Sequence, residues 1–95
     1  MTVTAPKGNR EDELLHDIDF STFVISLGSG AAMQLDPSNE NYDLALANQT
    51  IDILSMLEQK TAGNLTADEA DLLRGILYQT RLAWADARKA SAQGD

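Results

Sequence analysis

The segment from Phe20 to Leu35, FSTFVISLGSGAAMQL, runs for sixteen residues without a charged side chain. The whole chain has 95 residues and a net charge of −8, so a neutral stretch of this length is its most constraining feature. As a helix, the segment carries apolar or small residues around nearly its whole circumference, and such a helix is buried on more than one side. Two further helices of so short a chain can hardly cover it. We therefore expect a helix that a second subunit partly buries.

Size and cysteine content lead to the same expectation. A chain of 95 residues forms one domain, and its surface-to-volume ratio leaves little stability to spare. The sequence has no cysteine, which excludes disulfide bonds and thiolate metal ligands. A small chain without such cross-links depends on idealised helix packing or on oligomerisation. Both points favour a homo-oligomer, a dimer or larger.

The charge balance narrows the choice of partner and compartment. Carboxylates outnumber Lys and Arg by 15 to 7, whereas nucleic acid and anionic membranes attract clustered cations. The uncharged segment is too short, and too rich in Ser and Gly, for a membrane span of about 20 apolar residues. The beginning of the chain has no apolar segment of the signal-peptide type. We expect a cytoplasmic protein that binds neither nucleic acid nor membrane, with a protein partner as a further possibility.

The chain divides into one helical domain and two polar ends. Residues 1–18 are acidic with little apolar content, a composition that does not repay its ordering entropy, so a mobile N-terminal tail is expected. Residues 19–90 form a single three-helix domain, and residues 91–95 form a disordered C-terminal tail. The first helix runs from about Asp19 to Gln34, because Pro37 disfavours helical geometry at the residue before it.

Two more helices follow and form an antiparallel hairpin. The second helix is expected to begin near Asn39 or Asn41 and to end at Lys60. The third is expected to run from Ala67 to about Lys89. Because about four to six residues link them, the two helices lie side by side in opposite directions. The predicted fold class is therefore all-α, with three helices and the uncharged helix packed across the hairpin.

The link between these two helices carries the clearest local signals. Gly63 is placed to adopt the left-handed conformation that ends a helix. Thr66 and Glu69 have the spacing of a capping box, in which each side chain bonds the backbone N–H of the other residue. The sequence therefore predicts a well-defined start for the third helix.

The first helix carries two kinds of stripe. One is apolar. The other consists mostly of small residues, which let two helix backbones approach closely, and comprises Thr22, Ser26, Ser29, Gly30 and Met33. Gly28 and Gly30 each lower helix stability by about 1 kcal/mol relative to Ala, and this cost indicates close packing at this point. The alternative is a kink or fraying of the helix at Gly28. The residues predicted to form the subunit interface are Phe20, Phe23, Val24, Leu27, Gly30 and Ala31.

Asp52 lies between two isoleucines on the second helix. In an antiparallel hairpin it falls within about one turn of Arg81, so we expect an Asp52–Arg81 ion pair that sets the hairpin register. Buried pairs of this kind specify an arrangement more than they add stability. The alternative is a solvated Asp on the outer side of the helix.

Candidate chemical groups are few. His16 is the sole histidine, and without a cysteine or a second histidine it assembles neither a nucleophile–base pair nor a histidine-rich metal site. Residues 28–30 are a weak Gly-x-Gly match that lacks the context of a phosphate-binding loop. We therefore predict no catalytic residue, no cofactor site and no metal site.

Three segments carry a resemblance to a known family. They are FSTFVISL at residues 20–27, TIDILSMLEQKTAGNLTADEADLL at residues 50–73 and ILYQTRL at residues 76–82. The middle one holds the most specific pattern, IDxLxxLxxKTxGNLTxxExxLL. About two thirds of the chain resembles a bacterial family catalogued only as a domain of unknown function. The resemblance implies a short, all-helical, cytoplasmic protein with polar tails, and it brings no activity, cofactor or catalytic residue.

These observations favour a non-catalytic structural or interaction protein, such as an adaptor or a regulatory subunit, that self-associates through its first helix. The alternative is a protein that binds a small ligand or effector in a pocket between subunits, since ligand sites are apolar with a few polar groups. An enzyme that uses carboxylates such as Asp52 is a third reading. It is not the one we favour, because no partner group accompanies that residue.

Overall fold

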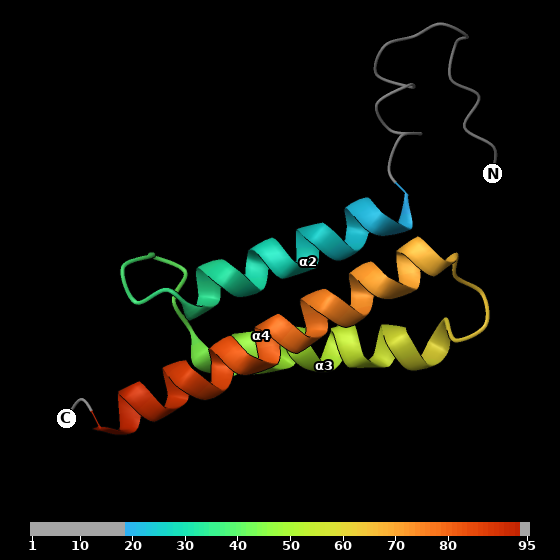
Figure 1. Ribbon diagram of the computed structural model, residues 1–95. Coiled ribbons are helices and arrows are strands. Elements are labelled where there is room, and N and C mark those ends of the chain that lie inside the picture. The colour runs from blue at the N-terminus through green and yellow to red at the C-terminus, as the bar shows by residue number, and fades with distance from the viewer. Residues whose placement is uncertain (1–18, 94–95) are drawn as a thin grey trace, which may run out of the picture.

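Three helices pack into a bundle in the computed structural model, which describes residues 19–93. They are α2 (Phe20–Leu35), α3 (Leu44–Lys60) and α4 (Ala67–Gln93), and each packs against the other two. Figure 1 shows that α2 and α4 run in the same direction and that α3 runs in the opposite one. Residues 19–93 contain no strand. The predicted all-α fold, with α3 and α4 as an antiparallel hairpin, is confirmed, whereas the tail expected at residues 1–18 lies outside the described residues.

Helices α2 and α3 start at aspartate caps. Asp19 accepts the backbone N–H of Thr22 at 2.8 Å, and Asp43 accepts that of Leu46 at 3.0 Å. The expected start of α3 near Asn39 or Asn41 was wrong. The Asn39 side chain accepts the N–H of Asn41 at 2.8 Å, so these residues form local turns that compete with a helix.

The link between α3 and α4 has the predicted geometry. Gly63 has a φ of +85°, in the left-handed region that favours glycine. The capping box is confirmed, because Glu69 N–H donates to Thr66 Oγ1 at 3.1 Å and Thr66 N–H donates to Glu69 Oε1 at 2.9 Å. At its other end α4 reaches Gln93, past the expected end near Lys89, because Ala and Gln continue a helix well and the next glycine is residue 94. Residues 91–93 of the expected tail therefore belong to the helix.

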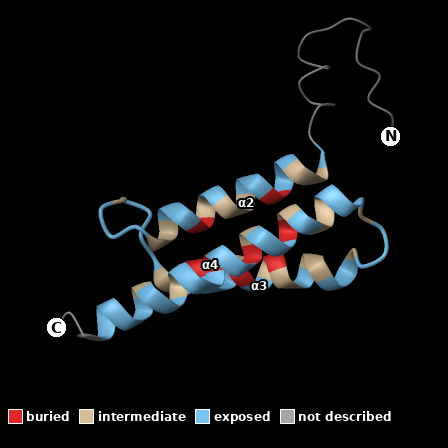
Figure 2. Ribbon diagram, in the orientation of Figure 1, coloured by how far each residue is buried: buried red, intermediate tan, exposed pale blue. Residues whose placement is uncertain are grey.

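The core lies along the line where the three helices meet, as Figure 2 shows. Its buried apolar side chains are Val24, Ala31, Ala47, Ile51, Leu54, Leu73 and Leu77. Thr80 is also buried, and its hydroxyl donates to the carbonyl oxygen of Ile76 at 2.8 Å, so its polar group is satisfied. The indole N–H of Trp84 donates to the carbonyl oxygen of Leu44 at 3.0 Å and joins the later part of α4 to the start of α3.

Polar contacts also hold α2 in place against α3. The backbone N–H of Asp43 donates to the carbonyl oxygen of Gln34 at 2.8 Å. The hydroxyl of Thr50 on α3 donates to Gln34 Oε1 at 2.9 Å. The end of α2 is therefore tied to the first half of α3, which sets the side of α2 that faces the core.

Candidate functional site: the outer face of α2

Four of the six residues predicted for the subunit interface face the core of their own chain. Val24 and Ala31 have no exposed surface, and Phe20 and Leu27 pack against the same core. The interface prediction was wrong for Val24 and Ala31, because the α3–α4 hairpin covers them completely, whereas Phe20 and Leu27 are only partly buried. Only Phe23 and Gly30 remain outside the core.

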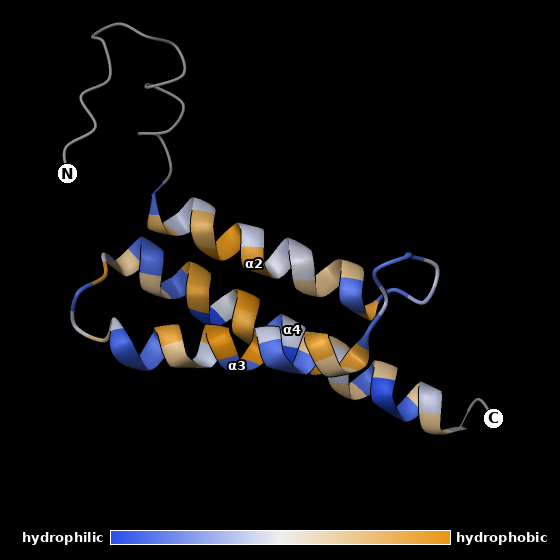
Figure 3. Cartoon of the chain, turned by 180° about the vertical axis from the view of Figure 1, so that it is seen from behind, coloured by the Kyte–Doolittle hydropathy of each residue, from blue (hydrophilic) through white to orange (hydrophobic). Residues whose placement is uncertain are grey.

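The opposite side of α2 is open and carries no charge. We call this surface the outer face; its residues are Thr22, Phe23, Ile25, Ser26, Ser29, Gly30, Ala32 and Met33. Ile25, Phe23 and Met33 are 49%, 44% and 43% exposed. In Figure 3, orange and pale colours run along most of α2, while blue segments interrupt α3 and α4. Sequence reasoning placed Thr22, Ser26, Ser29, Gly30 and Met33 on one stripe, but it did not select Ile25 or Ala32.

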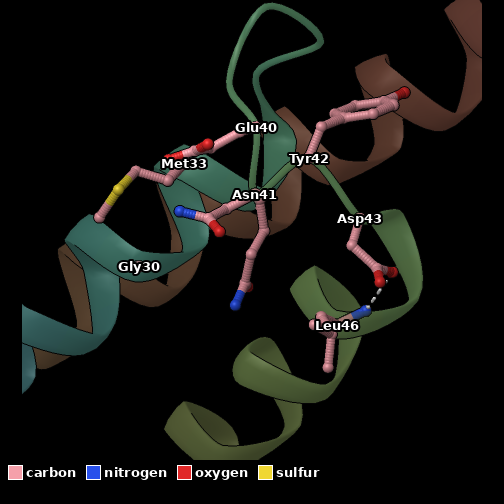
Figure 4. Close-up of a pocket in the computed structure, with 8 residues that line it drawn as sticks. Gly30, Met33, Glu40, Asn41, Tyr42, Asp43 and Leu46 are labelled. Atoms are coloured by element: carbon pink, nitrogen blue, oxygen red, sulfur yellow. Dashed lines mark hydrogen bonds between the residues drawn. The ribbon is translucent and has the colours of Figure 1, made fainter.

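Two shallow grooves border the outer face. On the α3 side, Gly30 and Met33 of α2 meet residues 40–43 and Leu46 around a volume of about 440 Å³ (Figure 4). On the α4 side, residues of α2 and α4 line a volume of about 380 Å³ that no charged side chain borders. The uncharged surface thus continues from the outer face to one side of α4.

The two glycines of α2 have different surroundings. A Cβ atom on Gly28 would lie 3.0 Å from Cγ2 of Ile76, so the expected close packing is confirmed there, and it is made with α4 of the same chain. The helix continues to Leu35 and does not end at Gly28. A Cβ atom on Gly30 would meet nothing within 4 Å among the described residues. Since Gly30 also lacks a positive φ, the contacts of the single chain do not require a glycine at this position.

The predicted Asp52–Arg81 ion pair is absent. Arg81 Nη2 instead donates to Ser55 Oγ at 3.3 Å, and Asp52 is exposed. Ser55 lies almost one helical turn beyond Asp52 on the side of α3 that faces α4, whereas Asp52 points away from the buried side that includes Ile51. The alternative of a solvated Asp is therefore correct.

The arginines of α4 each contact a neighbour within the chain. Arg74 forms an exposed ion pair with Asp71 at 3.0 Å. The guanidinium carbon of Arg88 lies 5.3 Å from the ring centroid of Trp84, within the range of a cation–π contact. Together with the bond from Arg81 to Ser55, these contacts involve all three arginines of α4.

Two carboxylates have lowered pKa values, and local hydrogen bonds cause both shifts. The backbone N–H and then the hydroxyl of Thr22 lower the pKa of Asp19, and the same two groups of Ser38 lower the pKa of Asp36. Within residues 19–93, no three His, Cys, Asp or Glu residues gather where they could hold a metal ion. Over the same residues, no helix has both the length and the apolar character required to cross a bilayer. His16 lies outside the described residues.

Comparison with known proteins places the chain in a family. No curated protein and no solved structure matches it. The sequence pattern of one family matches residues 17–86, which include α2, α3 and most of α4. The matched region therefore contains the outer face and both grooves beside it. The chain belongs to the family described as a domain of unknown function (DUF1844), in agreement with the resemblance seen in its sequence.

Proposed function

We propose that this chain is a small, non-catalytic interaction protein that self-associates through the outer face of α2. The observation that carries the proposal is the exposure of Phe23, Ile25 and Met33 on one uncharged helix face. Exposed apolar patches on soluble proteins often mark binding sites. We take a second copy as its occupant, because the outer face is neutral whereas residues 36–60 are strongly acidic.

The charge distribution supports pairing through α2. Residues 36–60 hold one cation and five carboxylates, whereas residues 20–35 hold no charge at all. Two copies that meet through other surfaces bring like charges together, and this opposes association. Contact through the outer face keeps most carboxylates apart.

The titratable groups support a non-catalytic role. The lowered pKa values belong to Asp19, which caps α2, and to Asp36, which forms a turn, so both shifts have a structural cause. Asp52 is exposed and has no hydrogen-bond partner among residues 19–93. A general acid or base works with a partner or a desolvated environment that tunes its pKa.

Sedimentation velocity over a range of concentrations tests self-association. The wild-type chain is expected to shift from monomer to dimer as its concentration rises. Ser26→Glu places a charge on the exposed centre of the outer face and is expected to yield a folded monomer. Gln59→Glu adds the same charge at an exposed site of α3 and is expected to behave like the wild type. A wild-type chain that stays monomeric, or equal effects of the two variants, would overturn the proposal.

Ionic strength gives an independent test of the same proposal. Raising the salt concentration from about 0.05 M to about 0.5 M shortens the screening length and weakens repulsion between two acidic chains. The dimer is therefore expected to become tighter with salt. Weakening by salt would indicate an interface held by ion pairs and would contradict the neutral outer face as the contact.

The groove between α2 and α4 favours ligand binding as a second candidate function. Ile25, Ala32 and Ile76 are among the residues that line its uncharged volume of about 380 Å³. A second copy on the outer face would close this groove and give the inter-subunit pocket that the sequence suggested. Binding of an uncharged apolar fluorophore tests this function. Saturable binding that Ala32→Glu abolishes and Gln59→Glu retains would support it. Equal binding by the wild type and both variants would exclude it.

A further inference from the structure

Resting on the proposed self-association, we infer that the two copies of α2 pair antiparallel, about a two-fold axis between Ser26 and Ser29. At two positions of the outer face, a large side chain is followed seven residues later by a small one. Phe23 is followed by Gly30, and Ile25 is followed by Ala32. This order makes the face complementary to itself in one direction only.

The helix geometry shows why the direction matters. Residues seven apart lie on nearly the same side of a helix, about 10 Å apart along its axis. An antiparallel partner turned about that two-fold axis brings its Gly30 to the same flank as Phe23 of the first copy, about 3 Å from it along the axis, and its Ala32 likewise to Ile25. Each contact occurs twice, as in any isologous interface. A parallel pair in register would bring the large Phe23 and Ile25 together at one end and the small Gly30 and Ala32 together at the other, which crowds the first end and leaves a void at the second.

Gly30 is the position that this arrangement explains. A glycine inside a helix lowers helix stability relative to alanine. Gly28 has Ile76 against it, whereas none of residues 19–93 fills the space above Gly30. In the antiparallel pair, the phenyl ring of Phe23 from the second copy enters that space. The glycine then provides the depression that receives an exposed aromatic side chain.

The centre of the outer face is suited to a close helix crossing. Ser26 and Ser29 are small, and both are exposed in the single chain. The hydroxyl of Ser26 donates to the carbonyl oxygen of Thr22 at 3.0 Å, so its burial leaves no unsatisfied donor. The two backbones can therefore approach closely where they cross.

Electrostatics at the helix ends also favour the antiparallel direction. Asp19 and Asp36 flank α2, and like charges face each other at the ends in either direction. These carboxylates therefore do not select one arrangement. The helix dipoles do, because antiparallel pairing places the positive end of each α2 beside the negative end of the other.

The size of the outer face sets the expected strength. A helix of 16 residues is about 24 Å long, and with a width near 10 Å it covers roughly 250 Å². Stable dimers bury roughly 800 Å² per partner, so the bordering grooves, including the exposed Leu46, must contribute. The dimer is therefore expected to depend strongly on concentration.

Disulfide trapping tests the direction of pairing. The chain has no cysteine, so Thr22→Cys and Met33→Cys each introduce the only thiol. The antiparallel arrangement places residue 22 opposite residue 33 of the second copy, and an equimolar mixture is expected to form a mixed disulfide dimer. Neither variant alone is expected to cross-link, because its two copies of the thiol lie about 16 Å apart along the axis. This separation exceeds the Cα–Cα range of a disulfide, roughly 4.4–6.8 Å.

The outcomes separate this inference from the proposed function. Gln59→Cys, exposed on α3, measures cross-linking by random collision. If the wild type is a dimer in sedimentation but each variant cross-links to itself, self-association stands and the antiparallel inference is wrong. A wild-type dimer without cross-linking above the Gln59→Cys level also overturns it. A monomeric wild type overturns the proposed function as well.

A size exchange tests the contact between Phe23 and Gly30. Gly30→Leu fills the depression and is expected to weaken association about tenfold or more. Combining it with Phe23→Ala moves the large side chain to the other position and is expected to restore association to within about threefold of the wild type. A double variant that associates no better than Gly30→Leu alone would contradict the contact.

Discussion

The two sides of α2 carry similar residues in opposite environments. Val24 is completely buried, while Ile25, the next residue and of the same aliphatic kind, is about half exposed. The inner side faces the α3–α4 hairpin, and nothing in residues 19–93 covers the outer face. The apolar content of a helix therefore shows how much it can bury, but its neighbours decide which side is covered. In this chain they cover one side only.

The largest expected difference between the two sides comes from introducing a charge. Val24→Asp removes about 2 kcal/mol of apolar burial and places a carboxylate in the core, so it is expected to lower the free energy of unfolding by at least about 4 kcal/mol. Ile25→Asp leaves its carboxylate in water and is expected to cost less than about 1 kcal/mol. Urea unfolding followed by circular dichroism measures both, at a concentration low enough to exclude dimers. Similar losses in the two variants would refute the difference between the faces.

The two phenylalanines give a smaller and more conservative comparison. Phe20 packs against the core, whereas Phe23 lies on the outer face. Phe20→Ala is expected to lower the free energy of unfolding by about 2 kcal/mol, and Phe23→Ala by less than about 0.5 kcal/mol in the monomer. Phe23→Ala is expected to reduce dimer formation instead. The same unfolding experiment, paired with sedimentation, separates the two roles, and a larger stability loss for Phe23→Ala would reverse our assignment.

The two glycines of α2 test the same difference between its two sides with smaller substitutions. Gly30→Ala enters open space and gains helix propensity, so it is expected to raise the monomer's free energy of unfolding by up to about 1 kcal/mol. Gly28→Ala gains the same propensity but places a methyl group 3.0 Å from Ile76 Cγ2, which offsets the gain. Thermal unfolding of both variants is expected to rank Gly30→Ala above the wild type and above Gly28→Ala. An equal increase for both would mean that α2 and α4 can separate at little cost.

The smallest expected effect is the pH dependence of the cap of α2. The pKa of Asp19 is lowered in the folded chain, because the N–H and hydroxyl of Thr22 donate to its carboxylate. Because this pKa is lower in the folded chain, the ionised cap stabilises the fold at pH values above the unfolded pKa of about 3.9. That stabilisation is lost as the pH falls through the folded pKa. Asp19→Asn keeps a cap acceptor without this titration. Urea midpoints between pH 7 and pH 3 are expected to fall less in this variant than in the wild type, and parallel curves would exclude the contribution.

Features that depend on neighbouring residues were readable from the sequence. The capping box of Thr66 and Glu69 and the left-handed Gly63 involve bonds within a few residues, so their spacing was sufficient to predict them. The hairpin followed from the shortness of the link. The predicted start of α3 was wrong although it also depends on local bonds. The Asn39 side chain accepts a nearby backbone N–H, and the sequence pattern alone does not show whether such a turn or a helical turn forms.

Features that depend on the packing angles between helices could not be predicted from the sequence. Asp52 and Ser55 are both compatible with a contact to Arg81 from their positions in the chain, and only the rotation of α3 against α4 placed Ser55 in reach. Part of the interface prediction was wrong for the same reason. A rotation of α2 by less than half a turn decides whether Val24 or Ile25 meets the core.

The sequence by itself determined that this chain is all-helical, where most of its helices begin and end, and that one helix carries no charge. These properties follow from backbone propensity, local capping bonds and composition, which act over a few residues. The tertiary structure alone decided that the α3–α4 hairpin buries the side of α2 with Val24 and Ala31, and leaves Phe23, Ile25 and Met33 exposed. That choice depends on how side chains far apart in the chain fit together when close-packed, and no local pattern contains this information.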